Sequence, residues 1–377
     1  MIGNYNSWNL KAKDFEFYQK NKFKIISEIT ENDYQNKKFS NKIFLYYDFI
    51  IPILYKKLNS ILNKNFDQKF WNILIGPWLF LFLEFYYSKY LIYKKIKKKK
   101  EFSILKNQQT IVENFNQFYE LSQKKDYNDL IFSQIHDYFQ KKKTTNIKNK
   151  KRNNEHYVTY KNKIRTKEKI LEFLSNFKQK DMYNENIVNF NLDLDLNNLF
   201  ELSNSSRKVV INYFKKIKNL SLKKNIFFSQ RNEFLYEKLK KKDTFCNLLN
   251  KTILKNLPKS YLEYFSFYEN FYKQFTKIND QKFLIRSPVE TTEKSRFLLA
   301  FLSLKKNKLL CFQEGGVGKP DCQKYYTKYY SKFCDQFYVW SKNSDNFSKS
   351  FYCTKTFWIK KYPINQKKTL ITLGSVK

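Results

Sequence analysis

The spacing of hydrophobic residues predicts that helices dominate the first 280 positions of the chain. Over residues 44–62, apolar side chains recur three and four residues apart, which predicts an amphipathic helix, and Pro52 within it predicts a kink. The same period predicts further helices at residues 102–139 with a break near 124–128, at 161–177, at 206–220, at 233–254 and at 260–275.

The pattern changes near residue 283, where short apolar runs begin to alternate with helical segments. The runs at 283–286, 308–312 and 337–340 predict buried strands, with helices at 294–304 and 320–333 between them. Residues 187–192 alternate like another strand, and residues 369–375 form a strand that runs into a glycine. Alternation of strands and helices is typical of a parallel sheet. We therefore expect an α/β protein in which a helix-rich N-terminal region precedes a parallel-sheet, Rossmann-like unit.

These patterns divide the chain into four regions. Residues 1–139 form a helical N-terminal region with an aromatic core segment. Residues 140–156 are basic and polar without any period, which indicates a loop or linker. Residues 157–280 are mostly helical, and residues 281–377 contain the Rossmann-like unit.

Residues 70–83 form the most hydrophobic stretch, and a lysine-rich tract at 94–100 follows it. A membrane span with a basic flank is one interpretation. The apolar run is shorter than the roughly 20 residues that a span requires, and Gly76 and Pro77 interrupt it. A buried core helix that begins near Pro77 is therefore the favoured interpretation. The lysine tract fits either a solvated helix end or attraction to an anionic membrane.

The amino-acid composition and net charge bear on which kinds of molecule the protein binds. The formal charge of +38, from 72 basic and 34 acidic residues, would ordinarily point to nucleic acid or anionic lipid. However, the charge is spread along the chain, and lysine, asparagine, isoleucine and tyrosine are abundant together, which is typical of A/T-rich codon usage. We therefore expect no nucleic-acid partner. The hydrophobic fraction of 42% and the aromatic fraction of 19% exclude a disordered polymer.

The residues that commonly bind metals do not form a recognisable set. The 5 cysteines include no C-x-x-C pair, which indicates a reduced, cytosolic protein. His136 and His156 are the only histidines, so we expect neither a histidine-based metal site nor a cofactor. Asp193 and Asp195 are paired, but nothing nearby completes a site, and we interpret them as loop acids. Residues 1–10 lack the apolar core of a signal peptide.

Three of the 6 glycines lie within residues 315–318, directly after the strand predicted at 308–312. Loops at the carboxyl ends of parallel strands are where α/β proteins bind ligands. The spacing matches neither the Walker A loop nor G-x-G-x-x-G, so a ligand-binding loop and a tight turn both remain open. The loop at 287–292 is expected to leave the same edge of the sheet, and this convergence favours a site.

The two loops supply candidates for each role in such a site. The backbone N–H groups of the glycines would hold a phosphate, because successive backbone amides form anion-binding concavities. Glu314 and Glu290 are the candidate acid/base groups. The candidate substrate and phosphate-binding residues are Arg286, Ser287, Gln313, Gly315, Gly316, Gly318 and Lys319.

Three segments resemble a family of large bacterial surface-polysaccharide transferases. Residues 70–79, FWNILIGPWL, are similar to its aromatic-Trp-Arg-Ile-Leu-Leu-Gly-Pro-Trp-Leu signature, and residues 127–131 are also similar. The third segment, residues 308–340, contains two similar stretches. Residues 313–318, QEGGVG, resemble the family's Gln-His-Gly-Gly-x-x-Gly loop, and residues 334–340, CDQFYVW, resemble its Ser-Asp-Arg-Tyr-x-x-Trp strand.

The resemblance implies a double-Rossmann (GT-B) glycosyltransferase. Such an enzyme would move a sugar or related group from a nucleotide-linked donor to a glycan acceptor. It would work in the cytoplasm, or peripherally at the inner face of the membrane.

The chain departs from this family in two ways. The loop histidine is replaced by Glu314, and the family continues well beyond the strand near Leu370. We therefore expect a chain truncated at its C-terminus, with the second GT-B domain missing or supplied by a separate chain. The alternative is a non-catalytic or decayed relative that binds an anionic polymer or a membrane surface through its lysine excess.

Overall fold

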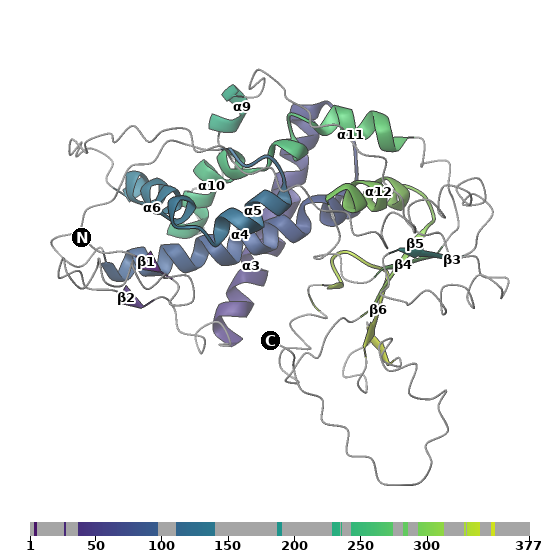
Figure 1. The fold of residues 1–377 in the computed structure, drawn as a ribbon, viewed down its shortest axis with the longest axis horizontal. Helices are drawn as coiled ribbons and strands as arrows, with labels where there is room; N and C mark the ends of the chain where they lie inside the picture. The colour runs from purple at the N-terminus through teal and green to yellow at the C-terminus, as the bar shows by residue number, and fades with distance from the viewer. Residues whose placement is uncertain are drawn as a thin grey trace, which may run out of the picture.

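Helices make up most of the described structure, and a parallel sheet lies beside them (Figure 1). The computed structural model describes residues 4–5, 26–27, 37–96, 111–139, 187–190, 228–233, 235, 243–273, 282–285, 293–312, 328, 330–339 and 348–350. One continuous hydrophobic core joins residues from Phe39 to Val339. The boundaries of the four regions expected from the sequence remain predictions.

Most helices predicted on described residues are present, with changed bounds. The helix expected at 233–254 was wrong at its start: a short helix ends at Asn232, residues 233 and 235 are not helical, and the long helix begins only at Thr244. The helix expected at 44–62 begins earlier, at Lys37, and the break expected near 124–128 separates α5 from α6. The helix expected at 260–275 is instead a 3-10 turn followed by a short helix. The predictions at 161–177 and 206–220 lie outside the described residues. The helices are α3 (Lys37–Leu62), α4 (Gln68–Ile96), α5 (Phe115–Ser122), α6 (Lys125–Phe139), α9 (Phe228–Asn232), α10 (Thr244–Asn256), η3 (Lys259–Tyr261), α11 (Phe265–Tyr272) and α12 (Glu293–Ser303).

Helix α4 begins at Gln68 and runs through Pro77, so the expectation of a start near Pro77 was wrong. Asp67 provides the physical reason, because its carboxylate accepts the Phe70 N–H at 2.7 Å and caps the first turn. Trp71 is fully buried and donates from its indole nitrogen to the Asn59 side-chain oxygen at 3.0 Å. A proline inside a helix costs about 3 kcal/mol, and the burial of this aromatic face offsets that cost.

Gly76 lies where α4 meets both α3 and the segment that leads into the sheet. A Cβ atom at this position would lie 2.6 Å from the Tyr47 hydroxyl oxygen and would collide with the Phe333 ring. Neither neighbour has room to move, since Tyr47 and Phe333 are buried and Tyr47 donates a hydrogen bond to Asn72. The glycine of the Gly-Pro-Trp signature therefore has an architectural role here.

The main sheet has five strands, all parallel, in the order β3-β4-β5-β6-β7. Its strands are β3 (Ile187–Phe190), β4 (Lys282–Ile285), β5 (Lys308–Phe312), β6 (Gln336–Val339) and β7 (Ser348–Ser350), and a separate parallel pair joins β1 (Asn4–Tyr5) to β2 (Ile26–Ser27).

The parallel sheet and the α/β class expected from the sequence are confirmed. Among the described strands, the spatial order follows the chain order from β3 to β7. These strands therefore contain no topological switch point, the place where the strand order of a doubly wound sheet reverses. The strand expected at 369–375 lies outside the described residues.

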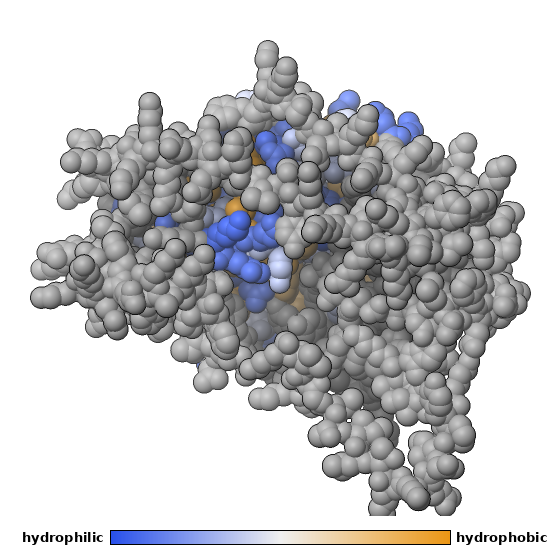
Figure 2. Space-filling model, in the orientation of Figure 1, coloured by the Kyte–Doolittle hydropathy of each residue, from blue (hydrophilic) through white to orange (hydrophobic). Residues whose placement is uncertain are grey.

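Helix α4 is long and apolar enough to cross a membrane, but most of its apolar surface is already buried inside the protein. Trp78, Phe82 and Leu83 have no exposed surface. In Figure 2 the described residues on the visible face are mainly hydrophilic, and hydrophobic ones show only in small areas between them. The core helix of a protein can be as long and as apolar as a membrane span. The burial of α4 inside the protein agrees with the interpretation of a core helix.

Gly76→Ala tests whether close packing or helix propensity determines the stability of the variant at this helix crossing. Propensity alone would stabilise the helix by about 1 kcal/mol. Because the added methyl group meets Tyr47 and Phe333, we expect a net loss of about 1–3 kcal/mol in the free energy of unfolding, measured by urea denaturation. Ser60→Ala, at an exposed position of α3, is the control and should change stability by less than about 0.5 kcal/mol. A stabilised Gly76→Ala variant would contradict the close approach.

Candidate functional site

The carboxyl ends of β4 and β5 lie next to each other in the sheet. Ile285, the last residue of β4, pairs with Cys311, and Phe312 at the end of β5 pairs with Tyr338 of β6. Adjacent strands lie about 4.8 Å apart, so the two chain segments that follow β4 and β5 start as close neighbours on one edge.

All nine residues predicted for the site fall in the segments that leave this edge. Arg286 directly follows β4, and Gln313 directly follows β5. These two residues and the rest of the predicted set lie outside the described residues, so their roles remain predictions. The remaining members are Ser287, Glu290, Glu314, Gly315, Gly316, Gly318 and Lys319.

The opposite, amino edge of the sheet is fixed by Asp335, which belongs to the CDQFYVW segment. Its carboxylate accepts the Leu309 N–H at 2.8 Å and the Lys69 ammonium at 2.8 Å, and its own N–H donates to the Leu309 carbonyl. These contacts align the starts of β5 and β6 and attach them to the first turn of α4. Asp335 is therefore architectural, and it lies at the end of the strands away from the predicted loops.

The described cysteines are buried and do not form a reactive pair. Burial raises the pKa of the Cys311 thiol well above its usual range, and the Cys334 thiol donates to the Tyr330 carbonyl at 3.2 Å. A buried thiol with a raised pKa is a poor nucleophile. His136, expected to be structural, lies 3.2 Å from the Tyr93 hydroxyl through Nδ1. Among the described residues, no three metal-binding side chains come together.

Glu293 is a buried carboxyl that the sequence pattern did not single out. It is the first residue of α12, the helix that follows the β4 loop, and it is only 5% exposed. Its Oε2 atom accepts the Phe115 N–H at 3.1 Å, which joins the start of α12 to the start of α5. Burial raises the pKa of the Glu293 carboxyl to about 7, although Arg296 and Ser260 act in the opposite direction. Carboxyl groups shifted in this way are concentrated at functional sites.

Arg296 lies one turn further along α12 and is completely buried. Its guanidinium carbon is 3.9 Å from the centre of the Phe115 ring, a close cation–π contact. None of its three guanidinium nitrogens makes a hydrogen bond within the part of the chain that the structure describes. Tyr261 is a close neighbour of Arg296. Burial raises the pKa of the Tyr261 hydroxyl, and the charge of Arg296 acts in the opposite direction. The two side chains do not form a hydrogen bond with each other.

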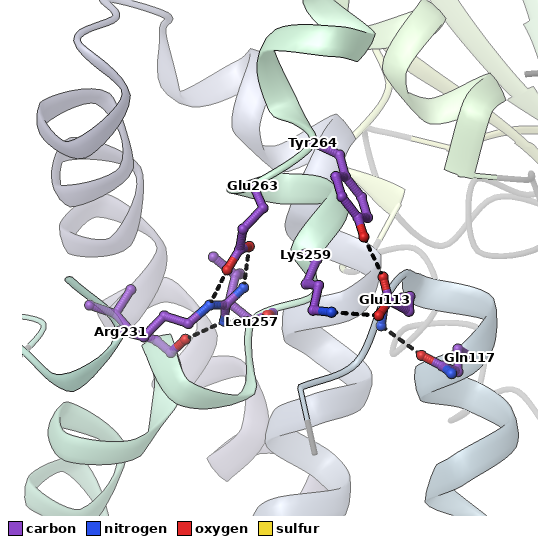
Figure 3. A network of polar contacts seen from close by, with 8 residues as sticks. Glu113, Gln117, Arg231, Leu257, Lys259, Glu263 and Tyr264 are labelled. Carbon is purple, nitrogen blue, oxygen red and sulfur yellow. Dashed lines mark hydrogen bonds and ion pairs between the residues drawn. The ribbon is translucent and has the colours of Figure 1, made fainter. Parts of the chain in front are cut away.

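Arg231, the other buried arginine among the described residues, shows how a structural guanidinium is accommodated in this protein. It makes a two-point contact with the Glu263 carboxylate, at 2.7 and 2.6 Å, and donates to the carbonyls of Leu254 and Leu257 (Figure 3). Each guanidinium nitrogen of Arg231 therefore has a partner. The two carbonyls lie at the C-terminal end of α10, so Arg231 also caps that helix. All the hydrogen bonds that Arg231 needs are present, whereas the guanidinium nitrogens of Arg296 have none among the described residues.

A second group of polar contacts holds α5 beside η3. Glu113 accepts hydrogen bonds from the Lys259 ammonium at 2.6 Å and the Tyr264 hydroxyl at 2.7 Å, and its N–H donates to Gln117 (Figure 3). The backbone adds two bonds, from the N–H groups of Lys259 and Ser260 to the carbonyls of Val112 and Glu113. This network fixes the position of Phe115, and therefore of the ring on which Arg296 rests.

Comparison with known proteins decides the family. The chain matches the LIC12162 family transferase over residues 3–375. The chain belongs to this transferase family. No curated protein and no solved structure matches it. Membership in the LIC12162 family confirms the expectation of a transferase over nearly the whole chain, including the aromatic segment of α4, the β4 and β5 loops, and α12.

The raised pKa of Glu293 predicts a particular dependence of stability on pH. Between its ordinary value of 4.5 and the folded value of about 7, the native state holds a proton that the unfolded state has released. Stability from this group is therefore full below pH 4.5 and is lost as the pH rises to 7, by at most about 3 kcal/mol. Glu293→Gln should have a flatter profile of unfolding free energy between pH 4.5 and 8.

Glu84 on α4 provides the matched comparison, because burial raises its pKa to about 7 as well. Glu84→Gln should remove a separate part of the slope, and the double variant should be flatter than either single one. A Glu293→Gln variant with the wild-type slope would show that its carboxyl is ionised in the folded protein.

Proposed function

We propose that this LIC12162 family transferase moves a sugar or a related group from a nucleotide-linked donor to a glycan acceptor in cell-surface polysaccharide synthesis. The observation that carries the proposal is the parallel register of β4 and β5, which starts both predicted loops at one edge of the sheet. Ligand sites in α/β proteins are built at this edge. The resemblance of residues 313–318 to the family loop supports the same location.

Within this proposal each loop has a distinct task. Backbone N–H groups of Gly315, Gly316 and Gly318 bind the donor phosphates, and the positive charges of Arg286 and Lys319 neutralise them as the leaving group departs. Ser287 and Gln313 line the same region. Glu314 replaces the family histidine as acid/base group, with Glu290 as the second candidate. The proposed chemistry assigns no role to a metal or another cofactor.

We place the protein in the cytoplasm, with peripheral contact at the inner face of the membrane. Lys94 and Lys95 support this placement, because both are exposed at the C-terminal end of α4. Basic side chains near a membrane surface contribute about 1 kcal/mol each toward an anionic leaflet. The buried apolar side of α4 argues against insertion of that helix.

Gly316→Trp tests the glycine loop directly. The full chain is incubated with a panel of nucleotide sugars and a glycan acceptor, and release of the nucleotide product is measured. A bulky side chain beside the phosphates should misplace the donor, and we expect a loss of activity of about 100-fold or more. The variant should keep the wild-type melting temperature, which separates a blocked site from a damaged fold.

Lys94→Gln combined with Lys95→Gln is the control for the alternative of a non-catalytic, charge-driven binder. A transferase should retain its activity in this double variant. A binder of anionic polymers or membranes should instead lose affinity in the lysine variant, ignore Gly316→Trp, and bind with a steep dependence on salt.

A further inference from the structure

The N-terminal ends of two helices meet at one buried point. Phe115 begins α5 and Glu293 begins α12, and the hydrogen bond between the Phe115 N–H and the Glu293 carboxyl joins the two ends. Each helix end carries a partial positive charge of roughly half an elementary charge. Arg296 adds a full charge to the same place, since its guanidinium lies on the Phe115 ring.

Glu293 is a weak counter-charge for this concentration of positive charge. Its pKa of about 7 leaves the carboxyl largely protonated below neutrality. No Glu293–Arg296 ion pair within 4.0 Å is found among the described residues, and the Oε1 atom of Glu293 accepts no hydrogen bond there. The other titratable groups around Glu293 are the hydroxyls of Tyr261, Tyr268 and Tyr272, all with raised pKa values.

A purely structural role does not explain Arg296. Burying an ionised side chain costs several kcal/mol unless hydrogen bonds and a counter-charge compensate. Arg231 meets that requirement with four hydrogen bonds, whereas the guanidinium nitrogens of Arg296 make none within the described chain. The hydroxyl of Tyr261, next to Arg296, and that of Ser260, next to Glu293, also lack hydrogen-bond partners there. Unused donors gathered around one positive charge are what an oxyanion would satisfy.

We propose that Arg296, with the N-terminal end of α12 and the hydroxyls of Ser260 and Tyr261, binds a phosphoryl-type oxyanion. The protonated carboxyl of Glu293 donates to that anion. The site lies on the side of α12 that packs against α5 and η3. That the anion is the donor's phosphate rests on the proposed function, whereas binding of an oxyanion does not.

The first experiment measures oxyanion binding to the full chain by calorimetry and by thermal shift. The probe is sulfate, which keeps its charge across the pH range used, with chloride at equal ionic strength as the reference. We expect a saturable stabilisation by sulfate in the wild type. Arg296→Met should weaken sulfate binding by about 10-fold or more, since a hydrogen-bonded charge contributes at least that factor. Without ligand it should be as stable as the wild type or more stable, because the unpaired charge is gone.

Arg231→Met is the matched arginine control. It leaves the Glu263 carboxylate buried without its partner and should therefore lower the melting temperature, while the remaining folded protein still binds sulfate. A sulfate effect no larger than that of chloride would overturn the proposal. An undiminished effect in Arg296→Met would overturn it as well.

The dependence on pH keeps the proposal testable if Arg296→Met does not fold. Wild-type affinity for sulfate should fall about 10-fold between pH 6 and pH 8, as Glu293 loses its proton. Glu293→Gln retains a neutral donor and should bind sulfate with little dependence on pH. Glu84→Gln, which removes a similarly shifted carboxyl elsewhere, should keep the wild-type profile. Equal profiles in the wild type and Glu293→Gln would refute the role of the carboxyl.

Inorganic phosphate and a nucleoside diphosphate identify the source of the anion. If the diphosphate binds more tightly than phosphate and Gly316→Trp weakens it, the anion belongs to the nucleotide donor. If the two bind equally and Gly316→Trp has no effect, the anion is free phosphate or a phosphorylated acceptor. Sulfate binding without any transfer activity would remove the proposed function and leave the oxyanion site standing.

Discussion

Helix α4 is packed on several sides at once, and the placement of the helices around it depends on that packing. It lies against α3, α6 and α12, and its aromatic face continues through Trp71, Trp78, Phe82 and Tyr86 without exposed surface. The Tyr47 and Phe333 side chains lie so close to the α4 backbone at Gly76 that no side chain fits there. Because Phe333 lies three residues before the start of β6, this crossing helps to set the distance between the helical layer and the sheet.

The described side-chain contacts that fix the sheet lie at its amino edge. Asp335 joins the starts of β5 and β6 to Lys69 of α4, so the amino edge is rigidly attached to the helical layer. The carboxyl edge is where β4 and β5 end beside each other, and the two loops of the proposed site follow these strands in sequence. Helix α12 connects the two layers, since it follows the β4 loop and packs on α4. Binding residues commonly lie on loops that a rigid scaffold positions, and the proposed site follows that rule.

The strands at the sheet centre were predictable because buried parallel strands consist of short apolar runs, as in residues 308–312. The start of α4 was not, because proline usually marks a first turn and the Asp67 cap is a weaker signal than Pro77. Glu293 and Arg296 were missed because polar residues at helical spacing resemble a solvated face. A compositional signal was available: arginine occurs only 6 times among 72 basic residues, and both arginines in the described part of the chain are buried. A rare arginine in a lysine-rich chain marks a position where lysine does not suffice.

Photo-crosslinking with azido-labelled nucleotide sugars, followed by peptide mapping, tests the central claim most directly, because it reports where a donor lies without requiring the acceptor. If the transferase site is built at the carboxyl edge of β4 and β5, label should concentrate in peptides that contain residues 286–292 and 313–319. Unlabelled nucleotide should remove that label by competition. Label confined to lysine-rich peptides elsewhere, sensitive to salt but not to unlabelled nucleotide, would contradict a donor site at this edge.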